Sequence, residues 1–142
     1  IDFGLSKQLT KQRTYSFCGS PEYMAPEVIR KEGHSLSVDW WGLGVLIYEF
    51  IAGGAKQEHT FKGASVTQVC RAALRGEITF GRNVDSFAKD IIQKLLHREP
   101  HLRLGTDFEE MKKHQFFRFV NWKQIEDKTF EPPAGFTNIC AP

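Results

Sequence analysis

The chain has 142 residues, of which 41% are hydrophobic and 13% aromatic, which is enough for one compact core. Its net charge is +2 and no cluster of lysine or arginine is dense, so the composition argues against nucleic-acid binding. The three cysteines are widely spaced, which argues against a disulfide framework or a zinc site and favours a reducing compartment. Because the chain opens with Ile1-Asp2-Phe3-Gly4 and has no initiator Met, we interpret it as a fragment.

Residues 1–37 contain several glycines and prolines and show no sustained hydrophobic periodicity. This pattern predicts a long loop with a short helix near its end. Loops of such length are usually either functional or disordered. The aromatic content of the segment, with Phe3, Tyr15, Phe17 and Tyr23, argues for an ordered loop.

Residues 38–52 are nearly all apolar apart from Asp39 and Glu49, and Gly53-Gly54 follows them. The segment is too short and too charged to span a membrane, so it predicts a buried helix that ends at the two glycines. A helix that is apolar on all sides must be surrounded by protein. We therefore expect this helix to lie at the centre of the domain.

Three shorter amphipathic helices are predicted downstream. The first covers residues 66–75 and ends at Gly76; the second covers 87–97, where Phe87, Ile91 and Leu95 repeat at helical spacing. A weaker pattern covers 108–116. Aromatic residues and prolines are irregularly spaced from Phe119 onward, which predicts an extended tail on the domain surface. The fold class is therefore mainly α, a helical bundle around one buried central helix.

Four motifs occur in a characteristic order. Asp2-Phe3-Gly4 alone is a weak signal, but Ala25-Pro26-Glu27 follows it, and the intervening segment 14–20 is rich in hydroxyl groups. This ordered pair is the signature of a protein kinase activation loop. Asp39-Trp40-Trp41-Gly42 then opens the apolar helix, and Arg103-Leu104-Gly105 lies far downstream. The order of all four makes a chance match a poor explanation.

The chain resembles the C-lobe of an AGC-group serine/threonine protein kinase. The string TYSFCGSPEYMAPEVI, residues 14–29, is similar to the activation segment in the N-terminal kinase domain of ribosomal S6 kinases and mitogen- and stress-activated kinases. The string HQFFRFVNWKQIEDKTFEPP resembles the start of the AGC C-terminal extension. The resemblance implies that residues 1–117 are the C-terminal part of a kinase domain, beginning with the Asp2-Phe3-Gly4 motif and the activation segment and continuing into the C-lobe. Residues 118–142 would begin the C-terminal extension.

The resemblance implies ATP and Mg²⁺ as cofactors. Asp2 would hold the Mg²⁺ that bridges the ATP phosphates, because a hard cation needs oxygen ligands. A solvated carboxylate is the alternative for this residue. Phe3 would pack between the two lobes of the kinase, and Gly4 would give the loop its backbone freedom.

Ser16 matches the position that is phosphorylated in AGC activation loops, so an upstream activating kinase is an expected partner. A phosphate adds about −1.5 to −2 charges and needs nearby cations. The resemblance implies Lys7 as one such cation. An exposed, unmodified Ser16 is the alternative.

Three residues are expected at the substrate. Ser20 stands where the family usually has Thr, and its hydroxyl would bond the catalytic Asp and help select Ser or Thr acceptors. Glu49 is a carboxylate in an apolar helix, which is costly unless it is paired. By resemblance Glu49, beside Tyr23, binds an arginine upstream of the phosphoacceptor in protein substrates. An internal partner for Glu49, or exposure at the helix end, is the alternative.

Three further residues are expected to be structural. Glu27 and Arg103 resemble the buried ion pair that joins the activation segment to the C-lobe. Asp39 would accept hydrogen bonds from the backbone of the catalytic loop, and it is also a favourable charge in the first turn of its helix. Residues 55–61 depart from the family pattern, and we expect Phe61 to fill the aromatic position there.

The parts of a kinase that transfer the phosphoryl group are not all in this sequence. The Gly-rich loop, the Lys–Glu pair and the catalytic Asp and Asn are missing, so we expect the isolated chain to be inactive. Three interpretations stay open: an active kinase represented in part, a pseudokinase or scaffold, and a truncated chain that acts as a decoy. We expect a monomer of the cytoplasm or nucleus, with no membrane span.

Overall fold

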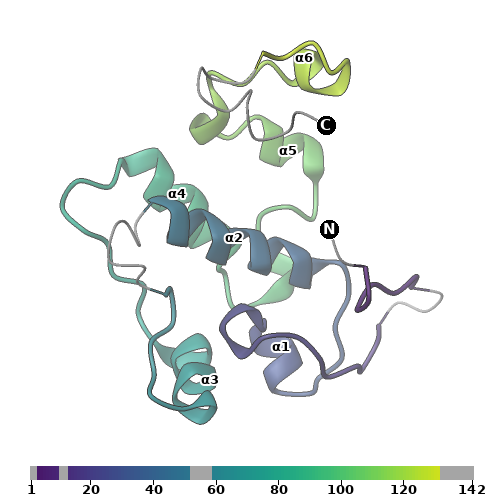
Figure 1. Cartoon of the computed structure of the whole chain (residues 1–142), viewed down its shortest axis with the longest axis vertical. Coiled ribbons are helices and arrows are strands. Elements are labelled where there is room, and N and C mark those ends of the chain that lie inside the picture. Colours follow the sequence, from purple (N-terminus) through teal and green to yellow (C-terminus); the bar gives the residue numbers. More distant parts are fainter. Residues whose placement is uncertain (1–2, 10–12, 52–58, 132–142) are drawn as a thin grey trace, which may run out of the picture.

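The computed structural model describes residues 3–9, 13–51 and 59–131 (Figure 1). The described residues form helices without a β-sheet, and one isolated antiparallel bridge joins Thr14 to His34. The mainly α fold class is therefore confirmed. None of the helices in these ranges is long and apolar enough to cross a membrane. In chain order the helices are η1 (Pro21–Tyr23), α1 (Pro26–Ile29), α2 (Ser37–Ile51), α3 (Val66–Arg75), α4 (Ser86–Leu95), η3 (Pro100–Leu102), α5 (Phe108–Lys112), η4 (Gln115–Phe117) and α6 (Trp122–Glu126).

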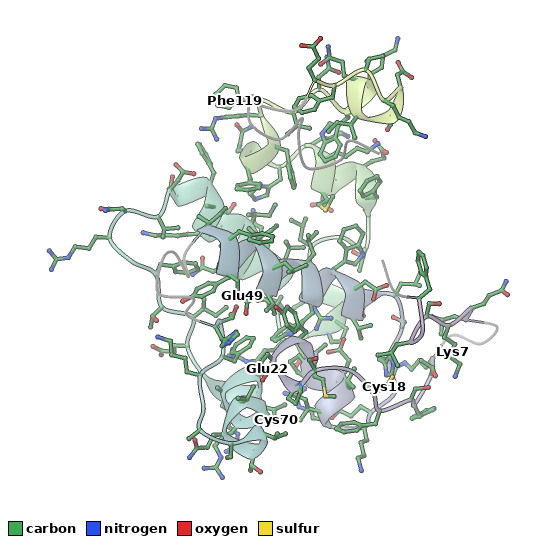
Figure 2. The ribbon with its side chains drawn as sticks, in the orientation of Figure 1. Lys7, Cys18, Glu22, Glu49, Cys70 and Phe119 are labelled. Carbon is green, nitrogen blue, oxygen red and sulfur yellow. The ribbon has the colours of Figure 1, made fainter. Side chains whose placement is uncertain are left out.

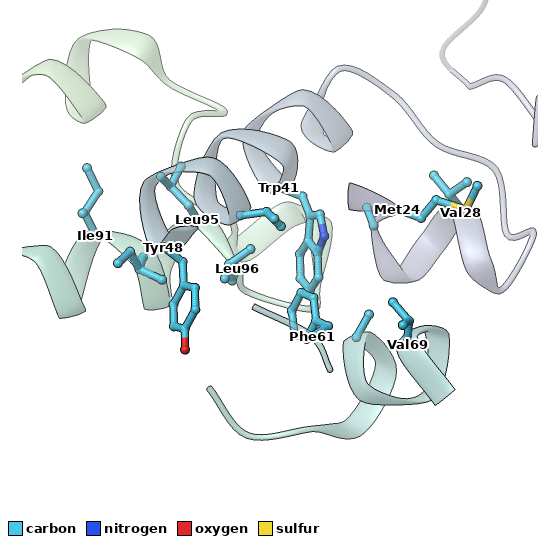
Figure 3. Close-up of a cluster of buried hydrophobic side chains, with 13 residues drawn as sticks. Met24, Val28, Trp41, Tyr48, Phe61, Val69, Ile91, Leu95 and Leu96 are labelled. Atoms are coloured by element: carbon cyan, nitrogen blue, oxygen red, sulfur yellow. The ribbon is translucent and has the colours of Figure 1, made fainter. Parts of the chain in front are cut away.

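Helix α2 crosses the middle of the molecule, with α1 and α3 on one side and α5 and α6 beyond the other (Figure 1). Its main packing partner is α4, which contributes Ile91, Ile92 and Leu95 to the same core. Trp41 of α2 is fully buried and stacks on Phe61 with ring centroids 5.4 Å apart (Figure 3). Phe61 thus fills the aromatic position expected of it. Burial of these large side chains is the main stabilisation of the fold.

One face of α2 differs from the sequence expectation. The sequence predicts a helix that is covered on all sides, but Phe50 is 80% exposed and Leu46 is 40% exposed. The opposite face, with Trp41 and Val45, is completely buried. Within the described residues, α2 therefore has one covered face and one open apolar face.

The segment predicted as one helix over residues 108–116 is divided in two. Helix α5 ends at Lys112 and the 3₁₀-helix η4 begins at Gln115. His114 lies between them in extended conformation, where its Nδ1 accepts the N–H of Phe116 at 3.1 Å. Its Nε2 lies 2.9 Å from a carboxylate oxygen of Asp90 in α4. The interactions of His114 stop the helix because they fix a non-helical residue there.

The extended tail expected after Phe119 is wrong for its first part, because residues 122–126 form α6. The side chain of Asn121 accepts the N–H of Gln124 at 3.2 Å and so caps this helix. Trp122 donates from Nε1 to the carbonyl of Lys112 at 3.2 Å. The Lys112 ammonium in turn lies 2.9 Å from Glu126. These bonds fold the tail back against α5.

Gly105 occupies a position that excludes a side chain. Its φ is +109°, and a Cβ there would lie 2.2 Å from Cδ2 of Trp40. Gly105→Ala is therefore expected to lower the free energy of unfolding by about 2–4 kcal/mol, through overpacking and backbone strain. Chemical denaturation measures the change. Gly81→Ala is the matched control, because no atom lies within 4 Å of its added Cβ; equal losses in both variants would contradict the packing argument.

Candidate functional site

The hydroxyl-rich part of the activation segment is held against the loop after α1. Thr14 and His34 exchange two backbone hydrogen bonds of 2.9 and 2.8 Å. The Tyr15 ring covers Gly33, whose φ is +79°, and a Cβ on Gly33 would come within 2.8 Å of that ring. The positive φ of Gly33 is what favours glycine at this position, since the exposed Tyr15 ring could shift. Together these contacts place the side chain of Ser16.

Lys7 and Ser16 lie together at the surface. The Lys7 ammonium donates to Oγ1 of Thr14 at 2.8 Å and to Oγ of Ser16 at 3.4 Å. The two hydroxyls are 3.3 Å apart. A cation is therefore already beside the hydroxyl that is predicted to carry a phosphate, where a charge-assisted hydrogen bond could form.

The predicted cofactor residues lie at the start of the chain. Asp2 is outside the described residues, so its predicted role as a Mg²⁺ ligand stays a prediction. The carbonyl of Phe3 accepts the N–H and the hydroxyl of Ser6 at 2.9 and 2.7 Å, and the Phe3 ring is exposed beside the exposed Gly4. In the parts of the chain that are described, no three His, Cys, Asp or Glu side chains gather as a metal site. Asp2 is the one carboxylate of the Asp2-Phe3-Gly4 motif that could bind Mg²⁺.

Ser20 and Asp39 line one groove between the activation segment and α2. The Ser20 carbonyl accepts the N–H of Tyr23 at 3.0 Å, which starts η1. Asp39 lies exposed in the first turn of α2. The groove has a volume of about 470 Å³, and we call it the Ser20–Asp39 groove. Its lining includes Leu5, Ser16, Ser20, Tyr23, Asp39 and Leu46.

Glu49 has two partners. Tyr23 donates its hydroxyl to Oε2 at 2.6 Å, and Nδ1 of His59 lies 2.9 Å from Oε1. The hydrogen bond to Glu49, followed by burial and the charges of Glu49 and Glu22, raises the pKa of Tyr23 to about 12. Tyr23 therefore keeps its proton and donates throughout the physiological range. The internal partner considered for Glu49 is present, although sequence reasoning did not single out His59.

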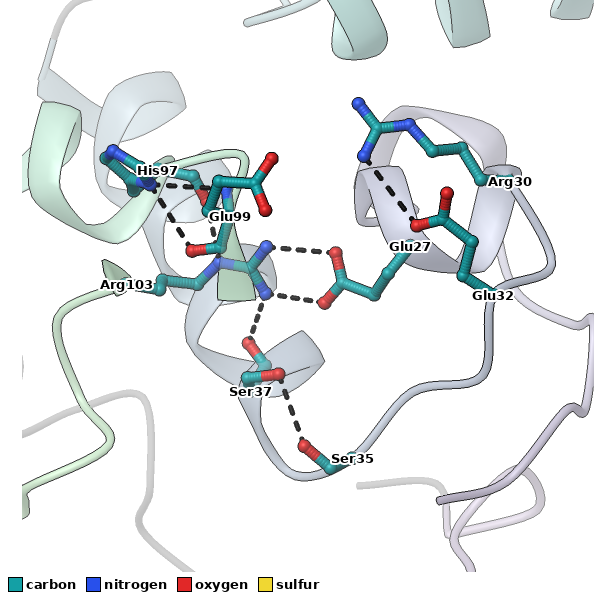
Figure 4. Close-up of polar contacts among 8 residues, drawn as sticks. All are labelled: Glu27, Arg30, Glu32, Ser35, Ser37, His97, Glu99 and Arg103. Atoms are coloured by element: carbon teal, nitrogen blue, oxygen red, sulfur yellow. Dashed lines mark hydrogen bonds and ion pairs between the residues drawn. The ribbon is translucent and has the colours of Figure 1, made fainter. Parts of the chain in front are cut away.

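Glu27 and Arg103 form the expected pair in the interior (Figure 4). Both side chains are almost fully buried, at 3% and 0% exposure. The Arg103 guanidinium donates to the two Glu27 oxygens at 2.7 and 3.0 Å, and also to the carbonyls of Ser37 and His97 at 2.8 and 3.0 Å. It lies 5.2 Å from the ring of Trp41. The end of the activation segment is thereby tied to α2 and to the loop after α4.

Comparison with known proteins gives the family. The sequence model of the protein kinase domain family matches residues 1–117. These residues include the activation segment, the Ser20–Asp39 groove and both members of the Glu27–Arg103 pair. The chain belongs to the protein kinase domain family. Family membership accounts for the order of the four motifs and for the helical packing around α2. The match ends before α6 begins.

Several curated kinases are similar to this chain over 93% of its length. The cAMP-dependent protein kinase catalytic subunit 3 of Drosophila melanogaster is 40% identical, and the serine/threonine-protein kinase gad8 of Schizosaccharomyces pombe is 41% identical. The human cAMP-dependent protein kinase catalytic subunit PRKX is 39% identical. The chain spans 22%, 23% and 36% of these relatives, respectively.

Proposed function

We propose that this chain is the C-lobe of an ATP- and Mg²⁺-dependent serine/threonine protein kinase of the AGC group. Its activation segment is most like those of the ribosomal S6 and mitogen- and stress-activated kinases, and residues 118–142 begin the C-terminal extension. The protein works as a monomer in the cytoplasm or nucleus. The family match and the similarity to several protein kinases support the reaction class.

The observation that carries this proposal is the Ser20–Asp39 groove. Both residues are expected to bond the catalytic loop, which is not part of this sequence, and both line the same open groove. The apolar face of α2 with Leu46 reaches the same groove. The groove is therefore the place where the catalytic loop docks. A structural role for Asp39 and a donor role for Ser20 both follow from that docking.

ATP bound with Mg²⁺ would supply the γ-phosphoryl group, with Asp2 as a metal ligand and Phe3 and Gly4 beside it. The residues of this chain hold the substrate and the catalytic loop in position and form no bond to the transferred group. The hydroxyl of Ser20 donates to the catalytic Asp and so helps to select Ser or Thr acceptors. The carboxylate of Glu49, held by Tyr23, binds a substrate arginine upstream of the acceptor.

A substitution that removes the charge of Glu49 but keeps its shape tests the arginine site. Glu49→Gln in the full-length protein is expected to lower kcat/KM for a serine peptide with upstream arginine by roughly 10- to 100-fold, the worth of a charge-assisted pair. A peptide with alanine in place of the arginine should be unaffected. The measurement is steady-state peptide phosphorylation.

Glu109→Gln serves as the control for that experiment, because Glu109 is an exposed acid on α5 that pairs only with Lys112 among the described residues. The Glu109→Gln variant should prefer the arginine peptide over the alanine peptide as strongly as the wild type does. Unchanged arginine preference in Glu49→Gln would remove Glu49 from the substrate site.

A further inference from the structure

His59 contacts the proposed arginine site from a segment that departs from the family pattern. It lies between α2 and α3, next to the buried pair Thr60 and Phe61, and its imidazole is 61% exposed. Its Nδ1 is 2.9 Å from Oε1 of Glu49, whose side chain is only 19% exposed. His59 is therefore one of the groups that cover this carboxylate. Figure 2 shows Glu49 near the middle of the molecule, with Glu22 below it.

The two oxygens of Glu49 are already engaged. Tyr23 donates to Oε2, and because a carboxylate accepts and does not donate, Nδ1 of His59 is the donor to Oε1. A guanidinium binds a carboxylate best through two parallel N–H donors, one to each oxygen. The imidazole of His59 thus stands where one arm of a substrate arginine would bind.

The two partners of Glu49 are not equally easy to move. Tyr23 belongs to η1, and its backbone N–H is bonded to Ser20, so its position is fixed by the activation segment. His59 is mostly in solvent, and among the described residues its side chain bonds only Glu49. An exposed pair of this kind is weak, whereas a bidentate arginine–carboxylate pair is stronger. An incoming arginine can therefore displace His59.

We propose that His59 is a specificity-determining residue that competes with the substrate arginine for Glu49. This inference rests on the proposed function, in which Glu49 binds that arginine. His59 lowers the affinity for arginine-containing substrates by occupying Oε1, and it leaves substrates without arginine unaffected. Among the described residues, the other charged and titratable groups at this site are Tyr23 and Glu22 of η1.

Substitutions of His59 in the full-length protein test the competition. His59→Ala frees Oε1 and is expected to lower KM for a serine peptide with upstream arginine by about two- to fivefold, the worth of an exposed pair. His59→Lys places a permanent cation there and should raise that KM by a similar factor. In both variants kcat, and KM for the matched alanine peptide, should equal the wild-type values. A general structural defect would change both peptides alike.

The outcomes separate this inference from the proposed function. A higher KM for the arginine peptide in His59→Ala would mean that His59 helps Glu49 bind arginine, and the competition would be overturned. Equal KM values in wild type, His59→Ala and His59→Lys would overturn the competition as well. The proposed function would still stand in that case, provided that Glu49→Gln loses its preference for the arginine peptide. If Glu49→Gln also keeps its preference, both proposals fail.

Discussion

Replacing Arg103 with methionine is expected to lower the free energy of unfolding by about 3–5 kcal/mol, because the Glu27 carboxylate would stay buried without a partner. Arg103 also donates to the carbonyls of Ser37 and His97, and those acceptors would lose their donor. Chemical denaturation of the purified protein measures the change. The double variant Glu27→Leu, Arg103→Met should recover part of the loss, since it removes the buried charge.

A surface pair provides the matched control. Nη1 of Arg30 lies 3.8 Å from Oε2 of Glu32, and the two side chains are 34% and 57% exposed. Such exposed pairs contribute about 0–1 kcal/mol to the free energy of unfolding. Arg30→Met should therefore cost far less than Arg103→Met. If the two variants lose equal stability, the buried pair does not hold the activation segment in place.

Ser16→Ala is expected to abolish activation of the full-length protein by an upstream kinase. The reason is that no phosphate could then form beside the Lys7 ammonium, which already lies 3.4 Å from the Ser16 hydroxyl. The measurement is peptide phosphorylation before and after treatment with the activating kinase. Activity should stay at the untreated level in the variant.

Two substitutions nearby make the Ser16 experiment specific. Thr14→Ala removes the neighbouring hydroxyl that also bonds Lys7, and it should still be activated. Lys7→Met should reduce the gain in activity on phosphorylation, because the phosphate would lose one cation. Full activation of Ser16→Ala would show that the switch lies at another residue.

The helices with clear ends were predictable from the sequence. The bounds of α3 agree with the expected residues 66–75, since Ser65 caps the first turn by accepting the N–H of Gln68 and Gly76 ends the helix. The short helix α6 was missed because five residues give little periodicity. Asn121, three residues before Gln124, was the available signal, since Asn is a preferred N-cap.

The candidate site was predictable only where a motif marked it. Glu27 and Arg103 are 76 residues apart, and the resemblance, not any spacing rule, indicated that they would meet. A carboxylate in an apolar helix indicated that Glu49 needed a partner, but not which one. His59 lies ten residues away and outside the described helices, so no periodicity places it. The contact depends on the path of the chain.

Phosphate transfer from ATP to a serine peptide with upstream arginine, measured for the full-length protein and its Asp2→Asn variant together, tests the central claim most directly. If the chain is the C-lobe of an active kinase, the phosphorylated wild type transfers phosphate and Asp2→Asn reduces the transfer to background. Absence of transfer in the phosphorylated wild type would favour a pseudokinase or scaffold, and undiminished transfer in Asp2→Asn would contradict the assignment of the metal ligand.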